Sequence, residues 1–265
     1  MNYNRYELVK IKKEGKVVVL TMDRPEALNA INPQLHDELE NIFADVGRDD
    51  DIQAVVLTGS GRAFCAGGDV KGMDAREFDS TLGAGAVIRS AKRLIHNLLD
   101  IEQPIIAAVN GHAVGLGATL ALFCDVIIAS ENAKFGDPHV TVGLVAGDGG
   151  AVIWPMLCGL AKAKEYLMTG DLLTATEAER VGLINHVVPQ DEVMSKAIQL
   201  AQRLANGPSK AIRWTKLVCN KRLRDEVNLV LDASLAVESL SMLTEDHREA
   251  TRAFIEKRAP RYKGR

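Results

Sequence analysis

The chain has 265 residues, of which 47% are hydrophobic and 25% are charged, and its formal net charge is −3. This length allows one large domain, or a domain with a small appendage. The charge gives no general electrostatic reason to bind nucleic acid or a membrane surface, so neither is expected as a partner.

The cysteines and the N-terminal residues predict an intracellular location. Cys65, Cys124, Cys158 and Cys219 lie far apart, without metal-like or paired spacing. This pattern is typical of reduced thiols in an intracellular protein. The first residues, MNYNRYELVKIKK, contain no apolar segment of the kind that a secretory signal has. We therefore expect a cytoplasmic protein.

The first predicted elements are a hairpin and a helix. Residues 7–22 predict two strands with a turn at Glu14 and Gly15. Residues 33–46 carry apolar side chains at helical spacing behind Asn32, which is a favourable N-cap residue, and behind a proline in the first turn. The sequence therefore predicts a helix with one buried face here.

Strands and helices then alternate to about residue 188. Short apolar runs rich in Val, Ile and Ala predict buried strands at residues 54–59, 105–109 and 125–129. Alternation of strands with helices favours parallel strand pairing with helical crossovers. The sequence therefore predicts an α/β fold for this part of the chain.

From about residue 190 onward the sequence predicts helices and no strands. Helical stretches, separated by Gly207-Pro208 and short polar breaks, cover residues 190–206, 208–221, 224–243 and 245–257. The third stretch carries more apolar residues than one buried side of a helix needs. We expect it to be buried between subunits as well as against its own core.

Two glycine-rich segments each follow a predicted strand. They are GRAFCAGGDVKGM at residues 61–73 and NGHAVGLGATLAL at residues 110–122. Glycine lets the backbone approach a ligand closely, and the second segment opens into a helix whose first N–H groups have no intrahelical acceptor. Such a pair of strand ends suits an oxyanion hole, in which backbone N–H groups stabilise charge on a carbonyl oxygen. Two tight turns in an α/β protein are the alternative.

These segments, in this order with four others, resemble the crotonase (enoyl-CoA hydratase/isomerase) superfamily over nearly the whole chain. The other segments are MDRPEALNAI, KFGDPHVTVGLVAGDGG, LMTGDLLTATEAERVGLINHVVP and FIEKRAPRYK. The resemblance implies a spiral core of ββα repeats over residues 1–189. It also implies a C-terminal helical region, residues 190–265, that forms homotrimers or hexamers of paired trimers.

The resemblance implies a coenzyme A thioester as substrate and no tightly bound cofactor or metal. Its carbonyl oxygen would lie between the backbone N–H groups of Gly68 and Leu116. His112 and Thr119 correspond to positions that line the acyl pocket. The residues implied in coenzyme A binding are Ala27, Leu28, Ala66, Asp69, Val70, Lys71, Phe254 and Lys257.

The chain departs from the hydratase pattern at both of its glutamates. Thr119 occupies the first position and His139, in FGDPH, occupies the second. A threonine hydroxyl is too weak a base near neutral pH to replace a carboxylate. Addition of water by paired glutamates is therefore not expected.

His139 and Asp148 remain as the candidate catalytic residues. Asp148 corresponds to a working aspartate of dienoyl-CoA isomerases and 4-chlorobenzoyl-CoA dehalogenases, and the His–Asp pair resembles 6-oxocamphor hydrolase, which cleaves a bond between carbonyl groups. Histidine titrates near neutrality and suits general base catalysis, while a carboxylate can orient its ring. The alternatives are a structural histidine, and an aspartate that caps the following helix.

Three functions stay open on the sequence alone. The first is an enzyme that stabilises a thioester enolate, of the hydratase/isomerase class. The second is a carbon–carbon bond hydrolase that uses His139 and Asp148. The third is an acyl-CoA-binding protein without activity, which the loss of both glutamates would explain.

Overall fold

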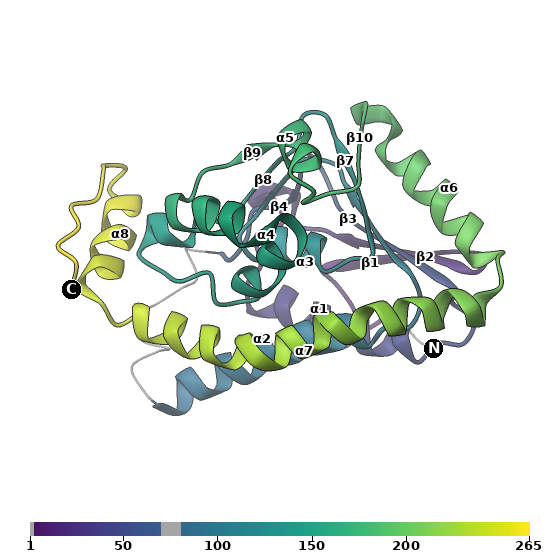
Figure 1. Ribbon diagram of the computed structural model, residues 1–265, viewed down its shortest axis with the longest axis horizontal. Coiled ribbons are helices and arrows are strands. Elements are labelled where there is room, and N and C mark those ends of the chain that lie inside the picture. The colour runs from purple at the N-terminus through teal and green to yellow at the C-terminus, as the bar shows by residue number, and fades with distance from the viewer. Residues whose placement is uncertain (1–2, 70–80) are drawn as a thin grey trace.

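The computed structural model describes residues 3–69 and 81–265 and contains two β-sheets. The larger sheet has the strand order β1-β2-β3-β5-β7-β10 (Figure 1). Its strands pair in parallel, except that β1 and β2 form an antiparallel hairpin. The strands are β1 (Val9–Glu14), β2 (Val17–Met22), β3 (Ala54–Gly59), β5 (Ile105–Val109), β7 (Val126–Ser130) and β10 (His186–Val188).

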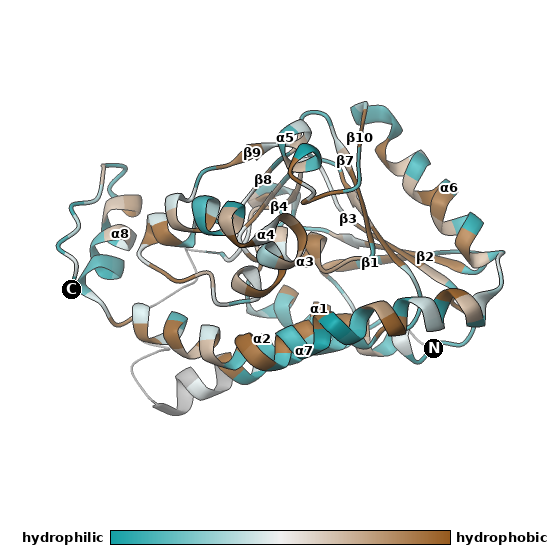
Figure 2. Ribbon diagram, in the orientation of Figure 1, coloured by the Kyte–Doolittle hydropathy of each residue, from teal (hydrophilic) through white to brown (hydrophobic). Residues whose placement is uncertain are grey.

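The inner strands β2, β3, β5 and β7 of the larger sheet are covered on both faces, which explains why they are almost continuously apolar, whereas the edge strand β1 is charged and partly exposed. Alternate side chains of a strand point to opposite faces. Val17 and Val19 of β2 therefore pack against α6 (Val193–Ala205), whereas Val18 and Leu20 belong to the main core. Figure 2 shows the strands of this sheet mostly in hydrophobic colours.

The smaller sheet has the order β4-β6-β8-β9 and completes a repeating unit. The strand pairs β3–β4, β5–β6 and β7–β8 each contribute one strand to the larger sheet and one to the smaller sheet, and a helix follows each pair. This is the expected spiral of ββα repeats, so the predicted fold class is confirmed. The smaller strands are β4 (Ala63–Cys65), β6 (His112–Val114), β8 (Lys134–Gly136) and β9 (Leu173–Thr174).

The helices after these strand pairs are α2 (Thr81–Asp100), α3 (Leu116–Leu122) and α4 (Gly150–Thr169). The 3-10 helix η3 (Pro138–Val142) precedes α4, and α5 (Ala175–Arg180) follows β9. The short strands β4 and β6 lie inside the two glycine-rich segments, where the sequence analysis predicted no strand.

The predicted hairpin and first helix are confirmed. Gly15 adopts a φ of 63° in the hairpin turn, a left-handed conformation that glycine accommodates without steric cost. The short helix η1 (Pro25–Ala27) follows, and α1 (Pro33–Gly47) begins behind Asn32, whose side chain accepts a hydrogen bond from the N–H of Leu35.

The C-terminal region is helical, as predicted, but its helices are divided differently. After η4 (Gln190–Glu192) and α6, a single helix α7 (Ser209–Ser241) covers the two stretches that were predicted as separate, and α8 (Glu245–Ile255) ends the helical part. The predicted break at residues 222–223 was wrong. The residues around that position include Lys221, Arg222 and Arg224 but no glycine or proline, and charged side chains alone do not interrupt a helix.

The long helix α7 packs along the body of the molecule against α2 and α4 (Figure 1). Val227, Leu231 and Leu235 are buried in this contact, whereas Leu229 and Leu240 are exposed. In the described part of the chain, no single helix is long and apolar enough to cross a membrane, and α7 with α8 meets that criterion only when joined across a 69° bend.

Candidate active site

A cavity of about 110 Å³ opens where strands β4, β6 and β8 end. Because these strands run parallel, the loops that follow them meet at one edge of the smaller sheet, which is where α/β proteins commonly bind ligands. The wall is mainly apolar, and His139 is its one ionisable side chain among the described residues. The lining residues are Ala66, Gly67, Gly68, Val114, Gly115, Pro138, His139, Thr141, Val142 and Leu144.

The backbone N–H of Gly68 faces away from its neighbouring segment. Ile31 donates its N–H to the carbonyl oxygen of Gly67 at 2.8 Å and accepts from the N–H of Asp69 at 3.0 Å. In a parallel bridge of this kind, the N–H and carbonyl groups of the central residue point to the opposite side. The N–H of Gly68 therefore points away from Ile31, and Gly68 itself lines the cavity, while its role as an oxyanion donor stays a prediction.

The backbone N–H of Leu116 is the second predicted donor. Leu116 is the first residue of α3, where a helix has no internal acceptor for the N–H group. Gly115, just before it, lines the cavity with a φ of 54° and donates its own N–H to Gly136 at 2.9 Å. The strand ends thus bring both predicted donor segments to one cavity.

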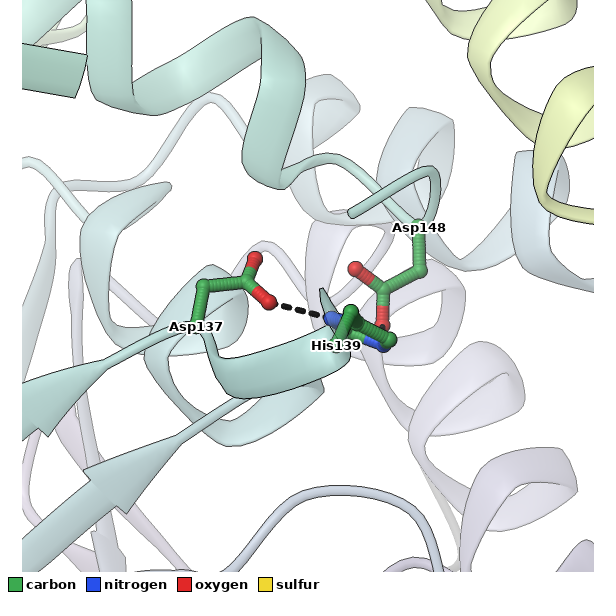
Figure 3. Close-up of side chains that lie close together, drawn as sticks. All are labelled: Asp137, His139 and Asp148. Atoms are coloured by element: carbon green, nitrogen blue, oxygen red, sulfur yellow. Dashed lines mark hydrogen bonds and ion pairs between the residues drawn. The ribbon is translucent and has the colours of Figure 1, made fainter. Parts of the chain in front are cut away.

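His139 lies in η3 with a carboxylate at each side of its ring (Figure 3). Its Nδ1 is hydrogen-bonded to Asp137, which is fully buried in the short loop between β8 and η3. Its Nε2 lies 3.6 Å from Oδ2 of Asp148. The predicted pair of His139 and Asp148 is therefore brought together, and Asp137 is a partner that the sequence analysis missed.

Asp148 lies between His139 and the first turn of the helix that follows it. Gly149 is the N-cap residue of α4, and no side chain provides a cap hydrogen bond there. The carboxylate of Asp148 nevertheless accepts a hydrogen bond from the backbone N–H of Gly150, the first residue of α4, so it contacts the helix end as well as His139. Thr119 is fully buried, and its hydroxyl approaches Oδ1 of Asp148 at 3.5 Å, the outer limit of a hydrogen bond.

A third carboxylate reaches the cluster from α7. Oε1 of Glu238 lies 3.9 Å from Nε2 of His139, and the residue is only 7% exposed. The hydroxyl of Ser234, one turn earlier, donates to the carbonyl oxygen of Gly147 at 2.8 Å. One helix thus contributes Glu238 and also fixes the loop that carries Asp148.

His139 and the carboxyl groups of Asp137, Asp148 and Glu238 are buried together. Their protonation is therefore coupled, because each charge changes the pKa of its neighbours. Burial alone would lower the pKa of His139, but the charges of Asp148 and Asp137 and the hydrogen bond to Asp137 raise it to about 10. Burial and the charge of Asp137 raise the pKa of Asp148 to about 6, although His139 opposes this. Burial and the charge of Asp148 raise the pKa of Glu238 to about 8.

Near neutral pH, these directions favour the imidazolium form of His139 and the protonated form of Glu238, and they bring the pKa of Asp148 closer to neutrality. Groups whose environments push their pKa values apart are suited to act as separate acid and base. The cluster therefore offers a proton acceptor and a proton donor beside the same nitrogen, Nε2, of one histidine ring.

The same groups are of the types that bind metal ions. Ligand atoms of Asp137, His139 and Asp148 lie within 4.8 Å of one another, a proximity that their sequence spacing did not suggest. The hydrogen bond between Asp137 and Nδ1 occupies one of the two ring nitrogens. The expectation that no metal is bound stays a prediction, which metal analysis of the purified protein tests.

The structure brings together some of the residues predicted to bind coenzyme A. Ala66 lines the cavity and donates its N–H to the carbonyl oxygen of Leu28, at the end of η1 next to Ala27. The carboxylate of Asp69 forms an ion pair with Arg24 at 3.2 Å, which anchors the segment behind Gly68.

Other predicted binding residues lie apart from the cavity. His112 is exposed at the start of β6, whereas the cavity is at the other end of that strand. Phe254 and Lys257 are exposed near the end of α8. Val70 and Lys71 lie outside the described residues. The roles implied for these residues stay predictions.

Asp137 and Glu238 were missed for different reasons. Asp137 stands two residues before His139, and its position after a strand gave no sign that it faces the ring. Glu238 had a detectable signal. It continues the buried stripe of Val227, Leu231 and Leu235 along α7, where a charged residue needs a reason to be buried.

Comparisons with known proteins agree with this architecture. Residues 12–265 match the family model described as enoyl-CoA hydratase/isomerase. A probable enoyl-CoA hydratase of Mycobacterium bovis is 36% identical over 257 residues, which cover 97% of this chain and 98% of that protein. The chain belongs to the enoyl-CoA hydratase/isomerase family.

Two solved structures of similar proteins show the range of that family. An enoyl-CoA hydratase/isomerase from Mycobacterium paratuberculosis superposes with a TM-score of 0.88 at 37% identity, covering 92% of this chain and 97% of that one. A β-diketone hydrolase from the cyanobacterium Anabaena, bound to (S)-3-oxocyclohexyl acetic acid, has a TM-score of 0.84 at 33% identity, covering 91% and 96%. The family as a whole implies coenzyme A thioesters as substrates, and its name leaves the reaction of this chain undecided.

Proposed function

We propose that this protein hydrolyses the carbon–carbon bond between the two carbonyl groups of a β-diketone. The observation that carries the proposal is the buried cluster of His139 with Asp148 and Glu238, placed beside the cavity that Gly68 lines. The similarity to the β-diketone hydrolase supports it, because that relative shares the fold over almost its whole length.

The proposed mode of substrate binding is based on the backbone N–H groups and apolar side chains around the cavity. One carbonyl oxygen of the diketone accepts hydrogen bonds from the N–H groups of Gly68 and Leu116, where an enolate would carry its charge. The short apolar arm of the substrate fills the space between Val114, Val142 and Leu144. This arrangement places the second carbonyl carbon towards His139.

Cleavage requires one water molecule. Asp148 takes a proton from the water as its oxygen attacks the second carbonyl carbon, because a carboxylate with a pKa of about 6 is available as a base near neutrality. The bond between this carbon and the central carbon breaks, and its electron pair forms the enolate. The attacked carbon leaves as a carboxylic acid.

Glu238 completes the reaction by protonating the carbon of the enolate to give a ketone, because its raised pKa keeps it protonated near neutrality. His139 then passes its Nε2 proton to Glu238 and accepts the proton held by Asp148, its neighbours at 3.9 Å and 3.6 Å. The cluster returns to its first state, and the sum is diketone plus water giving acid plus ketone.

A coenzyme A thioester is the second candidate substrate. It is favoured by the turn at Ala27 and Leu28 and by its hydrogen bond to Ala66, which the family resemblance implies in coenzyme A binding. With a thioester, the same enolate would form during isomerisation of a double bond. A silent acyl-CoA binder is disfavoured, because burying ionisable groups lowers folding stability and a protein without catalysis has no need of such a cluster.

A substrate panel decides between these functions. Acyclic and cyclic β-diketones are compared with crotonyl-CoA and longer enoyl-CoA thioesters, and products are identified by mass. We expect kcat/KM to be highest for a β-diketone and to fall by ~100-fold or more in His139→Gln. Turnover of the thioesters alone would favour the second candidate, and binding of thioesters without turnover would favour the silent binder.

We also propose that the protein forms cytoplasmic homotrimers or paired trimers. The support is the exposed apolar side of α7 and its surroundings, including Leu229, Val237, Leu240 and Leu243. Apolar side chains that recur along one helix favour contact with another subunit.

A further inference from the structure

Asp137 is a buried carboxylate whose recorded hydrogen-bond partner in the described part of the chain is His139. We infer that Asp137 is a positioning residue that keeps a hydrogen on Nδ1 of His139, so that Nε2 alone exchanges protons with Asp148 and Glu238. The catalytic consequence rests on the proposed function, but the placement of the hydrogen does not.

The surroundings of Asp137 leave its carboxylate little freedom. Asp137 occupies the N-cap position of η3, yet its side chain makes no cap hydrogen bond there. Its Oδ2 lies so close to Gly150 that a Cβ on that residue would meet it at 2.0 Å. The carboxylate is thus held between the first turn of α4 and the ring of His139, and the positive end of the helix dipole favours its charge.

The direction of the hydrogen bond follows from the chemistry of the two groups. An ionised carboxylate is only an acceptor, so Nδ1 must be the donor and must carry a hydrogen. A neutral imidazole has one N–H and one acceptor nitrogen. When His139 loses a proton, the proton therefore leaves Nε2, the nitrogen that faces Asp148 and Glu238.

The other titratable groups near the cluster leave this assignment intact. Cys65 of β4 interacts with Asp148, and burial raises the pKa of its thiol to about 12, so it stays neutral. His247 of α8 directs Nδ1 to the carbonyl oxygen of Val142 at 2.7 Å and is not recorded in contact with His139. Thr119 of α3 contributes a hydroxyl without charge.

Asp137→Asn tests the inference because it keeps the shape of the side chain and removes its charge. The negative charge of Asp137 raises the pKa of His139, Asp148 and Glu238, so its removal lowers all three. Both limbs of the bell-shaped pH profile of kcat/KM should therefore move to lower pH. An amide can also donate to Nδ1 and stabilise the wrong tautomer, so kcat should fall ~100-fold or more while KM changes little.

Asp49→Asn is the matched control, since Asp49 is another buried aspartate, paired with Lys13 and Tyr3 and absent from the cavity wall. It should lower stability without moving the pH profile. An Asp137→Asn profile that keeps both limbs in place, with kcat near wild type, would overturn the inference.

Nuclear magnetic resonance of the histidine-labelled wild-type protein, without substrate, gives an independent result even if the variant does not fold. We expect a downfield Nδ1–H signal that persists across the pH range in which the protein is folded. A neutral His139 protonated on Nε2 instead would overturn the inference. The expected signal in a protein that cleaves no β-diketone would support the inference and contradict the proposed function.

Discussion

His139, which was expected to replace the second glutamate of hydratases, lies between Asp137, Asp148 and Glu238. Three carboxyl groups around one buried ring raise its pKa and favour the imidazolium form. In the proposed mechanism the base is Asp148, and His139 afterwards relays the proton from Asp148 to Glu238. Thr119 keeps only a weak contact with Asp148.

The first prediction compares Asp148 with Thr119. Asp148→Asn removes the proposed base and should lower kcat/KM by ~100- to 10,000-fold. Thr119→Ala removes only a hydroxyl that lies 3.5 Å from Oδ1 of Asp148, and it should change kcat/KM by less than ~10-fold. Steady-state kinetics with a β-diketone, after a check of folding by circular dichroism, measure both. Near-full activity of Asp148→Asn would show that the cluster is structural.

The second prediction concerns the stability cost of Glu238. Its pKa rises from an ordinary 4.5 to about 8 on folding, so the folded state favours the protonated form. The free energy of unfolding should therefore fall as the pH rises from about 4.5 to about 8. Glu238→Gln cannot ionise and should be more stable than wild type at the alkaline end, although less active. Denaturant titrations at several pH values test this, and identical pH dependence of both proteins would contradict it.

At the scale of elements, the ends of three short parallel strands and one turn of α7 assemble the site. The apolar runs and glycine clusters predicted the larger strands and the loops of the cavity, because burial and backbone freedom leave local signals. The placement of Asp137 and Glu238 could not be predicted this way. Their roles depend on how η3 and α7 pack against each other, which no local pattern encodes.

The third prediction concerns the segment after β4. Gly68→Pro removes one oxyanion donor while leaving the hydrogen bonds of Gly67 and Asp69 to Ile31 in place. Activity should fall by ~100- to 1,000-fold. Gly68→Ala is the control, since it keeps the N–H and adds only a methyl group. Equal activity of the two variants would show that the N–H of Gly68 is not a catalytic donor.

The fourth prediction concerns the loop that α7 fixes. Ser234→Ala leaves the carbonyl oxygen of Gly147 without its side-chain donor and should lower the free energy of unfolding by ~1–3 kcal/mol. Ser239→Ala is the matched control on the same helix, because its hydroxyl bonds only within the helix, to Leu235. Denaturant titrations at a fixed protein concentration measure the free energy of unfolding of both variants. Equal stability of the two variants would contradict a role of α7 in holding this loop.

At the scale of the whole molecule, the helical region does more than the sequence predicted. The last strand ends at Val188, close to the expected boundary, but α6 covers a face of the larger sheet and α7 supplies Glu238 to the active site. Because α6 completes the core and α7 carries Glu238, removing this region would disrupt both the core and the site. The exposed apolar side of α7 is then available for other subunits.

The fifth prediction is that the protein forms trimers or pairs of trimers. Burying exposed residues such as Leu229 and Leu240 between subunits removes apolar surface from water. Light scattering at micromolar concentration measures the mass in solution. Leu240→Glu should shift the distribution towards smaller species, because it places a charge in the contact. A monomeric wild-type protein would contradict the proposal.

The reaction itself is tested most directly with a cyclic β-diketone in water enriched in oxygen-18. The mechanism breaks the ring at the bond between the carbonyl groups and gives a keto acid that has gained one molecule of water. We expect its carboxylate to carry one labelled oxygen, and this product to be absent with Asp148→Asn. Recovery of the unopened ring, together with hydration or isomerisation of an enoyl-CoA by the same preparation, would contradict the account.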